Sequence, residues 1–240
     1  MKARLLYWIF LFVPKNHLSF IVGKVANIKS PKFLVRLITK CFIKFYKINT
    51  DEVAKDIKDF KSLGEFFNRD LKAGARPLQG DFVSPVDARL RNAEKLDKLS
   101  LEVVKGKSYD LAKFIGSDED VKKFDGGYFI NLYLSPKDYH NVHSPVSGVI
   151  SGVRYIPGKL WPVTDWSLNT VEDLFSINER LVFDIESEFG EMFLVMVGAT
   201  NVGKMSSKFL DFKTNNLNAR VARDFPIGRE VSIMEKIGCI

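Results

Sequence analysis

Apolar residues in the first 75 positions recur at the spacing typical of helices. A helix is predicted from Ser30–Pro31 to about Tyr46, with the serine as its cap and the proline at its first helical position. A shorter helix is predicted over residues 62–71, where Ser62 and Glu65 have the spacing of a capping box. The front of the chain is therefore expected to be helical.

Residues 5–13 form the most apolar run of the chain. A run of this length is too short to cross a bilayer as a helix. Lys2 and Arg4 precede it, as in a signal peptide, but Pro14 and further lysines follow it in place of a small-x-small cleavage site. We interpret the run as an interfacial or buried helix, with a transmembrane anchor as the alternative.

From residue 82 onward, short runs rich in aromatic and β-branched residues alternate with turn signals and predict strands. The predicted strands cover residues 101–104, 128–134, 148–155, 181–185 and 192–197, with one small helix over 111–114. The turn-rich stretch of residues 73–80 is the expected boundary between the two patterns. The chain is thus predicted to be an α+β protein, in which membrane-associated helices over residues 1–75 precede a β-rich core over residues 76–240.

Charge is distributed unevenly along the chain. Residues 1–50 contain ten lysines and arginines and no acidic residue, so they carry +10. The rest must carry −3 for the whole chain to reach its net charge of +7. A basic front end on a nearly neutral body indicates an acidic partner, either lipid headgroups or nucleic acid.

The predicted helix after Ser30 concentrates this charge on one stripe. Its basic residues follow one another at spacings of three and four, and are Lys32, Arg36, Lys40, Lys44 and Lys47. Apolar and aromatic residues fill much of the remaining circumference, a pattern typical of a helix lying in a membrane interface. A core helix with a solvated edge fits the pattern nearly as well, but the absence of acidic residues favours the membrane. No nucleic-acid-binding fingerprint is present, so no nucleic acid partner is predicted.

The cysteines and histidines define the chemistry that is available. Cys41 and Cys239 lie far apart in the sequence and form no Cys-x-x-Cys, which is typical of a reducing compartment without a disulfide framework. His140 and His143, two of the three histidines, lie three positions apart between the strand-like run 128–134 and Pro145. A turn that holds two imidazoles is a natural place for proton transfer or metal chemistry. Asp87, directly after a proline turn, is by itself more often a turn-capping residue than a catalyst.

Several motifs of the chain, taken in order, resemble the phosphatidylserine decarboxylase proenzymes. They have roughly the spacing of that family, and the resemblance covers nearly the whole chain. The matching segments are Phe66-Phe67-x-Arg69, Pro85-Val86-Asp87, Tyr133 to Pro145, Tyr155 to Leu160, Asn178-Glu179-Arg180 and Val197 to Thr200. Ala88 departs from the family, in which glycine is common at this position.

The resemblance implies a specific chemistry. Members of this family cut themselves at a Gly-Ser bond, and the serine becomes an N-terminal pyruvoyl group. By motif, Asp87 and His143 are the pair that activates this serine, as the orienter and base of a serine protease do. The pyruvoyl carbonyl joins the serine amine of phosphatidylserine and takes up electrons as CO₂ leaves. His140 matches the histidine of the decarboxylation step, which positions substrate or transfers a proton.

The family's Gly-Ser-Thr should follow a segment of the form Glu-x-x-Gly-x-Phe. Glu235 to Ile240 matches most of this form, which puts the expected serine a few positions past Ile240. The pair Gly116-Ser117 precedes the histidines and has the pattern of a helix cap. We therefore expect these 240 residues to be a truncated proenzyme or a large-subunit portion, whose own activity is in doubt and which a small pyruvoyl subunit would complete.

Two classes of function follow. The first is the decarboxylase that makes phosphatidylethanolamine from phosphatidylserine, working as a homo-oligomer, peripherally, on the cytoplasmic side of the cell membrane. The second is a peripheral membrane-binding protein or a metal-dependent hydrolase that uses Asp87, His140 and His143. No further Cys or His is placed as a metal ligand at an ordered spacing, so no metal is predicted.

Overall fold

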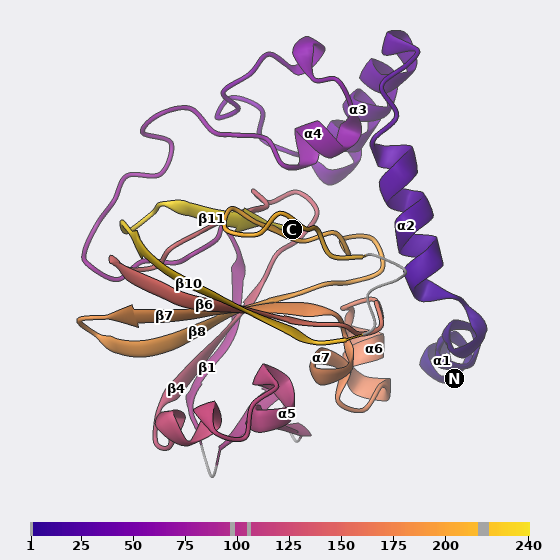
Figure 1. Ribbon diagram of the computed structural model, residues 1–240. Helices are drawn as coiled ribbons and strands as arrows, with labels where there is room; N and C mark the ends of the chain where they lie inside the picture. Colours follow the sequence, from indigo (N-terminus) through magenta and orange to yellow (C-terminus); the bar gives the residue numbers. More distant parts are fainter. Residues whose placement is uncertain (1, 97–98, 105–106, 216–220) are drawn as a thin grey trace.

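The computed structural model describes residues 2–96, 99–104, 107–215 and 221–240 and has an α+β fold with a β-rich core (Figure 1). The helices are α1 (Lys2–Phe12), α2 (Lys15–Ala26), α3 (Lys32–Tyr46), α4 (Leu63–Phe67), α5 (Leu111–Ile115), α6 (Asp165–Thr170) and α7 (Leu174–Ile177), with 3-10 turns at Ile57–Asp59 and Asp120–Phe124. The strands are β1 (Arg89–Lys95), β2 (Ser100–Val104), β3 (Lys107–Asp110), β4 (Tyr128–Tyr133), β5 (Asn141–His143), β6 (Gly148–Ile156), β7 (Arg180–Ser187), β8 (Gly190–Val197), β9 (Ser206–Ser207), β10 (Arg223–Val231) and β11 (Lys236–Cys239).

Two antiparallel sheets enclose the main hydrophobic core. One has the strand order β10-β6-β7-β8 and the other has the order β5-β11-β9. Alternate residues of β7, such as Phe183 and Ile185, point into this core and are fully buried. From the other sheet, Val142 of β5 and Ile237 of β11 join the same cluster. The core therefore fixes the strand that carries His143.

The five strands and the small helix predicted from apolar patterns are confirmed as β2, β4, β6, β7, β8 and α5. Strands β5, β9 and β11 are two to four residues long and carry too few positions for a periodic signal. Strand β10 contains Pro226 and Gly228, which mark turns in a sequence, and its pairing with β6 shifts register between Pro226 and Arg229. The domain boundary expected at residues 73–80 stays a prediction.

The front helices form a small core of their own. Phe66 of α4 is fully buried and packs edge-on against Phe60, at 5.3 Å between ring centroids. The predicted cap of α4 is confirmed, because the Ser62 hydroxyl accepts a hydrogen bond from the Glu65 backbone N–H at 3.1 Å. The reciprocal half of the capping box is wrong: the Glu65 carboxylate accepts from the backbone of Lys61.

The helix predicted from Ser30 is confirmed as α3, but its predicted start is wrong. The helix begins at Lys32, and Pro31 is the residue before it, in an extended conformation. No side chain caps this end. Serine before proline is a frequent helix start, but here the backbone turns into the helix only after the proline.

Helix α1 contains all but the last residue of the run 5–13 and packs against the core on one side only. Tyr7 stacks on Trp161 at 5.8 Å between ring centroids, and Phe10 contacts Trp166 of α6. Trp8 and Phe12 on its other side are 60% and 82% exposed. Among the described residues, no single helix has the length and apolar composition needed to cross a membrane. The bent pair Leu6–Phe12 and Lys15–Ala26 passes that test together, on length and composition alone.

The Asn178-Glu179-Arg180 motif forms a buried polar scaffold. The Asn178 amide donates to the carbonyls of Trp161 and Gly198 and accepts from the Trp161 N–H, each at 2.9 Å. The Glu179 carboxylate accepts from the Tyr155 hydroxyl at 2.6 Å, and burial raises the pKa of Glu179. Arg180 donates to four backbone carbonyls, those of Phe114, Ser176, Asn178 and Lys113. These residues therefore tie loops to the start of β7.

Candidate functional site

The histidine segment begins where β4 ends. Asp138 closes a turn there, because its carboxylate accepts from the Ser135 N–H at 2.7 Å while its own N–H donates to the Ser135 carbonyl at 2.8 Å. The chain then enters β5 at Asn141 and pairs with β11. The sequence predicts a turn for both histidines, and this is wrong for His143. His143 is a strand residue because the backbone of β11, more than ninety residues away in the chain, pairs with it.

His140 lies in a closed, largely apolar environment. Its side chain is 1% exposed and its ring centroid lies 4.0 Å from that of Phe67. Its Nδ1 lies 2.9 Å from the Asp138 carbonyl oxygen, which can only accept, so Nδ1 carries the proton and Nε2 the lone pair. Burial and, to a smaller extent, the charge of Arg69 lower the pKa of His140 to about 4, against the opposing effect of the hydrogen bond to the Asp138 carbonyl. His140 is therefore a neutral imidazole with its basic nitrogen at Nε2.

His143 has the same tautomer for the same reason. Its Nδ1 lies 2.7 Å from the Met234 carbonyl oxygen, so Nδ1 donates and Nε2 is left as an acceptor. The Tyr139 hydroxyl occupies that acceptor at 3.1 Å, and burial raises the pKa of Tyr139, which keeps the phenol protonated. Tyr139 therefore donates to the nitrogen that a general base would use.

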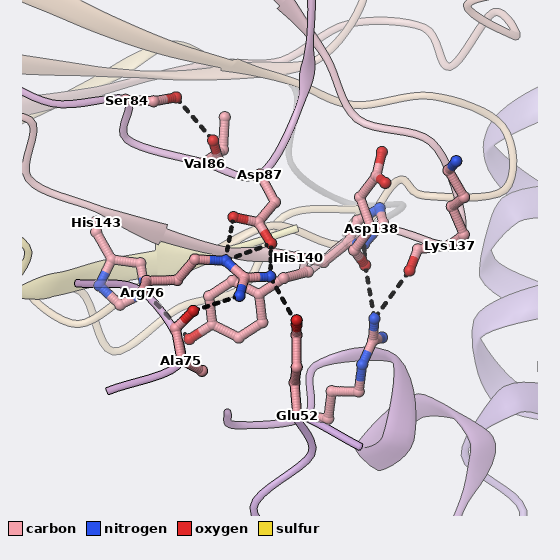
Figure 2. Close-up of polar contacts among 12 residues, drawn as sticks. Glu52, Ala75, Arg76, Ser84, Val86, Asp87, Lys137, Asp138, His140 and His143 are labelled. Carbon is pink, nitrogen blue, oxygen red and sulfur yellow. Dashed lines mark hydrogen bonds and ion pairs between the residues drawn. The ribbon is translucent and has the colours of Figure 1, made fainter. Parts of the chain in front are cut away.

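Asp87 lies beside the histidine segment but is hydrogen-bonded elsewhere. Its two carboxylate oxygens accept from Arg76 in a bidentate pair, at 2.9 and 3.0 Å from Nε and 2.5 Å from Nη2. The same guanidinium bonds Glu52 at 2.9 Å, and these carboxylates raise the pKa of Arg76 (Figure 2). The backbone brings Asp87 and His143 near each other, since the His143 N–H donates to the Pro85 carbonyl at 2.9 Å.

No hydrogen bond joins the Asp87 carboxylate to His143 in the part of the chain that the structure describes. The two residues therefore lie in one region without forming the orienter-and-base contact that the resemblance implies. The roles of Asp87 and His143 stay predictions. A hydrogen bond between the two side chains requires Arg76 to release the Asp87 carboxylate.

A pocket of about 680 Å³ opens beside these residues. Its lining includes Arg76, Asp87, Arg89, Tyr133, Lys137 and Asp138. The wall carries three cationic side chains and two carboxylates, and Arg76 is paired with one of these, Asp87. The other two cations, Arg89 and Lys137, suit a substrate that carries negative charge. Within the described ranges, no group of three or more His, Cys, Asp or Glu is arranged to hold a metal ion. The metal-hydrolase alternative therefore has no ligand set there.

The front of the chain supplies one wall of this site. Phe67 contacts His140, and the Asn68 amide donates to the Ile240 carbonyl at 3.0 Å. Arg69 is 4% exposed and donates through Nη2 to the carbonyls of Lys137 and Asp138, at 2.9 and 3.2 Å. In Figure 1, α4 lies close to the C-terminal strand β11, consistent with these contacts.

In the sequence, Arg69 belongs to a motif that does not indicate its role, and no pattern marks Arg76 or the Tyr139 hydroxyl as a functional group. The available signal is weak. Arg69 and Arg76 are two basic residues in a segment predicted as helix and turn, and Tyr139 lies inside the histidine motif. The hydrogen-bond partners of these three residues lie between four and almost seventy positions away in the sequence.

Comparison with known proteins gives a consistent result. A family model described as phosphatidylserine decarboxylase matches residues 63–240. The phosphatidylserine decarboxylase proenzyme of Dechloromonas aromatica (strain RCB) is 39% identical over 198 residues, which are 81% of this chain and 70% of that protein. That of Vibrio parahaemolyticus serotype O3:K6 (strain RIMD 2210633) is 37% identical over 243 residues, covering 99% of this chain and 84% of that protein. That of Brevibacillus brevis (strain 47 / JCM 6285 / NBRC 100599) is 38% identical over 213 residues, covering 87% and 75%.

Proposed function

The chain belongs to the phosphatidylserine decarboxylase family, and we propose that it provides the catalytic body of an enzyme that converts phosphatidylserine to phosphatidylethanolamine and CO₂. The observation that carries the proposal is the pair His140 and His143. Both have a proton fixed on Nδ1 by a backbone carbonyl and a lone pair on Nε2, and the turn that leads into them lines a pocket together with Asp87 and Arg89.

We propose that the reaction uses a pyruvoyl group formed from a serine a few positions past Ile240. The residues present fit such a group. Ile240 donates its N–H to the His140 carbonyl at 3.1 Å, so β11 leads directly to the histidine segment. Three or four further residues reach at most about 10–14 Å in extended conformation, which keeps the serine near both histidines. Arg69 Nε and Nη1 and Asn141 Oδ1 are buried there without a partner among the described residues, so the site has polar groups to spare.

The pyruvoyl group supplies a carbonyl that accepts the electron pair left behind when CO₂ departs. This chain's residues provide what such a carbonyl needs. His143 Nε2 is the base that removes the proton from the serine hydroxyl during self-cleavage, after the Tyr139 hydroxyl has given up that position. Asp87 stabilises the protonated form of His143 once the Arg76 pair has opened.

His140 serves the decarboxylation step. A neutral imidazole with its lone pair on Nε2 can take a proton from the substrate ammonium and return it to the carbon that loses CO₂. Burial at 1% exposure excludes water around the imidazole, which strengthens each of its polar contacts. Arg89 and Lys137 on the pocket wall are placed to attract the phosphodiester of the lipid.

The experiment that tests this function adds the family's Gly-Ser-Thr segment, with roughly 25 residues to supply the closing strands. The extended chain should cut itself and release CO₂ from phosphatidylserine vesicles, with phosphatidylethanolamine as the lipid product by mass spectrometry. A version with alanine in place of the new serine controls for the pyruvoyl group and should stay uncut and inactive. Complete self-cleavage without any CO₂ release would exclude the proposed substrate.

We propose further that the enzyme works peripherally at an anionic membrane surface, through α1, α2 and α3. Large apolar side chains are exposed on all three helices: Trp8, Ile9, Leu11, Phe12, Leu18, Ile21, Val25, Phe33, Leu34, Leu37 and Phe45. The basic stripe from Lys32 to Lys47 is exposed along α3 beside them. An apolar face bordered by cations is the surface that an interfacial helix presents to lipid.

Charge reversal on this stripe should weaken membrane binding. Each basic residue near an anionic surface contributes about 1 kcal/mol, so Lys40→Glu/Lys44→Glu should lower affinity for phosphatidylserine-rich vesicles about 30-fold or more. The measurement is vesicle co-sedimentation. Lys95→Glu/Lys122→Glu makes the same change of charge on exposed lysines outside the front helices and should bind normally. Raising salt to 1 M shortens the screening length to about 3 Å and should release much of the protein. Equal binding of both double variants would contradict the proposed surface.

A further inference from the structure

One backbone carbonyl connects Arg69 to His140. The Asp138 oxygen accepts from His140 Nδ1 at 2.9 Å and from Arg69 Nη2 at 3.2 Å, which uses both of its lone pairs. The same Nη2 also donates to the Lys137 carbonyl at 2.9 Å. The guanidinium therefore holds the carbonyl groups of Lys137 and Asp138, which lead into the segment of His140.

Both side chains are enclosed. Arg69 is 4% exposed and its guanidinium lies over the Phe66 ring, at 5.2 Å from the ring centroid. His140 is 1% exposed and lies against Phe67, the residue that follows Phe66. In such a low-dielectric environment a hydrogen bond is stronger and a displaced partner costs more than at the surface. The position of the Asp138 carbonyl is therefore tightly coupled to the guanidinium.

Among the described residues, Arg69 differs from Arg180, the other arginine that is almost fully buried. Arg180 uses its Nε, Nη1 and Nη2 on four carbonyls, as expected of a group that only ties loops together. Arg69 directs its hydrogen bonds to the histidine segment alone, while its Nε and Nη1 have no partner among the described residues. Keeping a buried cation so incompletely bonded costs stability. That cost points to a role for the cation in the site itself.

We propose that Arg69 is a positioning residue for the decarboxylation step: it holds the Asp138 carbonyl so that His140 keeps its proton on Nδ1 and its lone pair on Nε2. This inference rests on the proposed function of His140. The charge acts in the same direction as the geometry, because a nearby cation disfavours the imidazolium. Charged groups also lie on the neighbouring segments: Asp138 on its own turn, whose carboxylate is bonded to the Ser135 N–H, and Asp70, the residue after Arg69, which pairs with Lys236 of β11.

The test follows the ring nitrogens of His140 by ¹⁵N NMR across pH, in the wild type and in Arg69→Gln, Arg69→Lys and Arg180→Lys. The wild type should show the Nδ1–H tautomer and stay neutral to a pH near 4. Arg69→Gln removes the charge and the second donor to the Asp138 carbonyl, so the tautomers should mix and the pKa should rise above about 4, while burial, the larger cause of the low pKa, remains. Arg69→Lys keeps the charge, so the tautomers should mix with a smaller rise in pKa. Arg180→Lys controls for the loss of a buried arginine and should leave both signals unchanged.

These NMR measurements require no decarboxylation, so they separate the two proposals. An Nε2–H tautomer in the wild type, or an unchanged His140 titration in folded Arg69→Gln, would overturn the positioning role. If Arg69→Gln fails to fold, the wild-type tautomer and Arg69→Lys still decide the question. In the extended, self-cleaving chain, Arg69→Gln should still be cut, while the acidic limb of its decarboxylation profile moves to higher pH. Absence of activity in every variant, with the NMR result as expected, would reject the proposed reaction and leave the positioning role intact.

Discussion

Replacing His143 by alanine should leave the extended proenzyme as one uncut band. His143 Nε2 is the lone pair that would take the serine proton, because Nδ1 is committed to the Met234 carbonyl at 2.7 Å. A positioned general base contributes on the order of 10²–10⁴ in rate, so its loss stops cutting on the time scale of a purification. Gel electrophoresis and intact mass, which detect the large and small subunits, measure the outcome.

Two further variants make this result specific. Asp87→Asn keeps the shape of the side chain but removes its charge, so cutting should be severely slowed. His17→Ala removes the third histidine, which is exposed on α2, and should be cut as fast as the wild type. Since His143 is only partly exposed, circular dichroism should verify that each variant is folded. Normal maturation of His143→Ala would mean that another group is the base.

Replacing His140 should separate the two reactions that this site performs. His140→Ala should still be cut, but its decarboxylation rate should fall by on the order of 10²–10⁴, the usual contribution of a proton-transfer group. Because His140 is almost fully buried, alanine leaves a cavity, so His140→Asn is the sharper variant. Its amide N–H can still donate to the Asp138 carbonyl, but it has no nitrogen that accepts a proton. Wild-type CO₂ release by His140→Asn would exclude a proton-transfer role.

The low pKa of His140 predicts the pH dependence of this step. With a pKa of about 4, lowered chiefly by burial, the imidazole is neutral at every pH above about 5. The rate should therefore stay constant with respect to His140 between pH 6 and 8, and fall only as pH drops toward 4. The limb that belongs to His140 is the one that disappears in His140→Asn. A midpoint near 6.5 for that limb would mean that the imidazole is solvated during the reaction.

The sequence alone was sufficient for elements whose own residues carry the signal. β6, β7 and β8 have eight or nine residues each and alternate into a common core, so their apolar pattern is visible without any partner. Helix α3 carries its basic and apolar faces at helical spacing. The order of the motifs around Asp87, His140 and His143 is also enough to indicate the family.

The tertiary structure decided what those residues touch. Met234 fixes the His143 tautomer from 91 positions away, and Arg69 reaches the Asp138 carbonyl from 69 positions away. Asp87 is paired with Arg76, where the motif implied His143. Local periodicity records which face of an element is buried, because each residue obeys the same 2.0 or 3.6 repeat. A single hydrogen bond between distant segments follows no such repeat. The sequence pattern therefore does not predict it, and only the folded structure shows it.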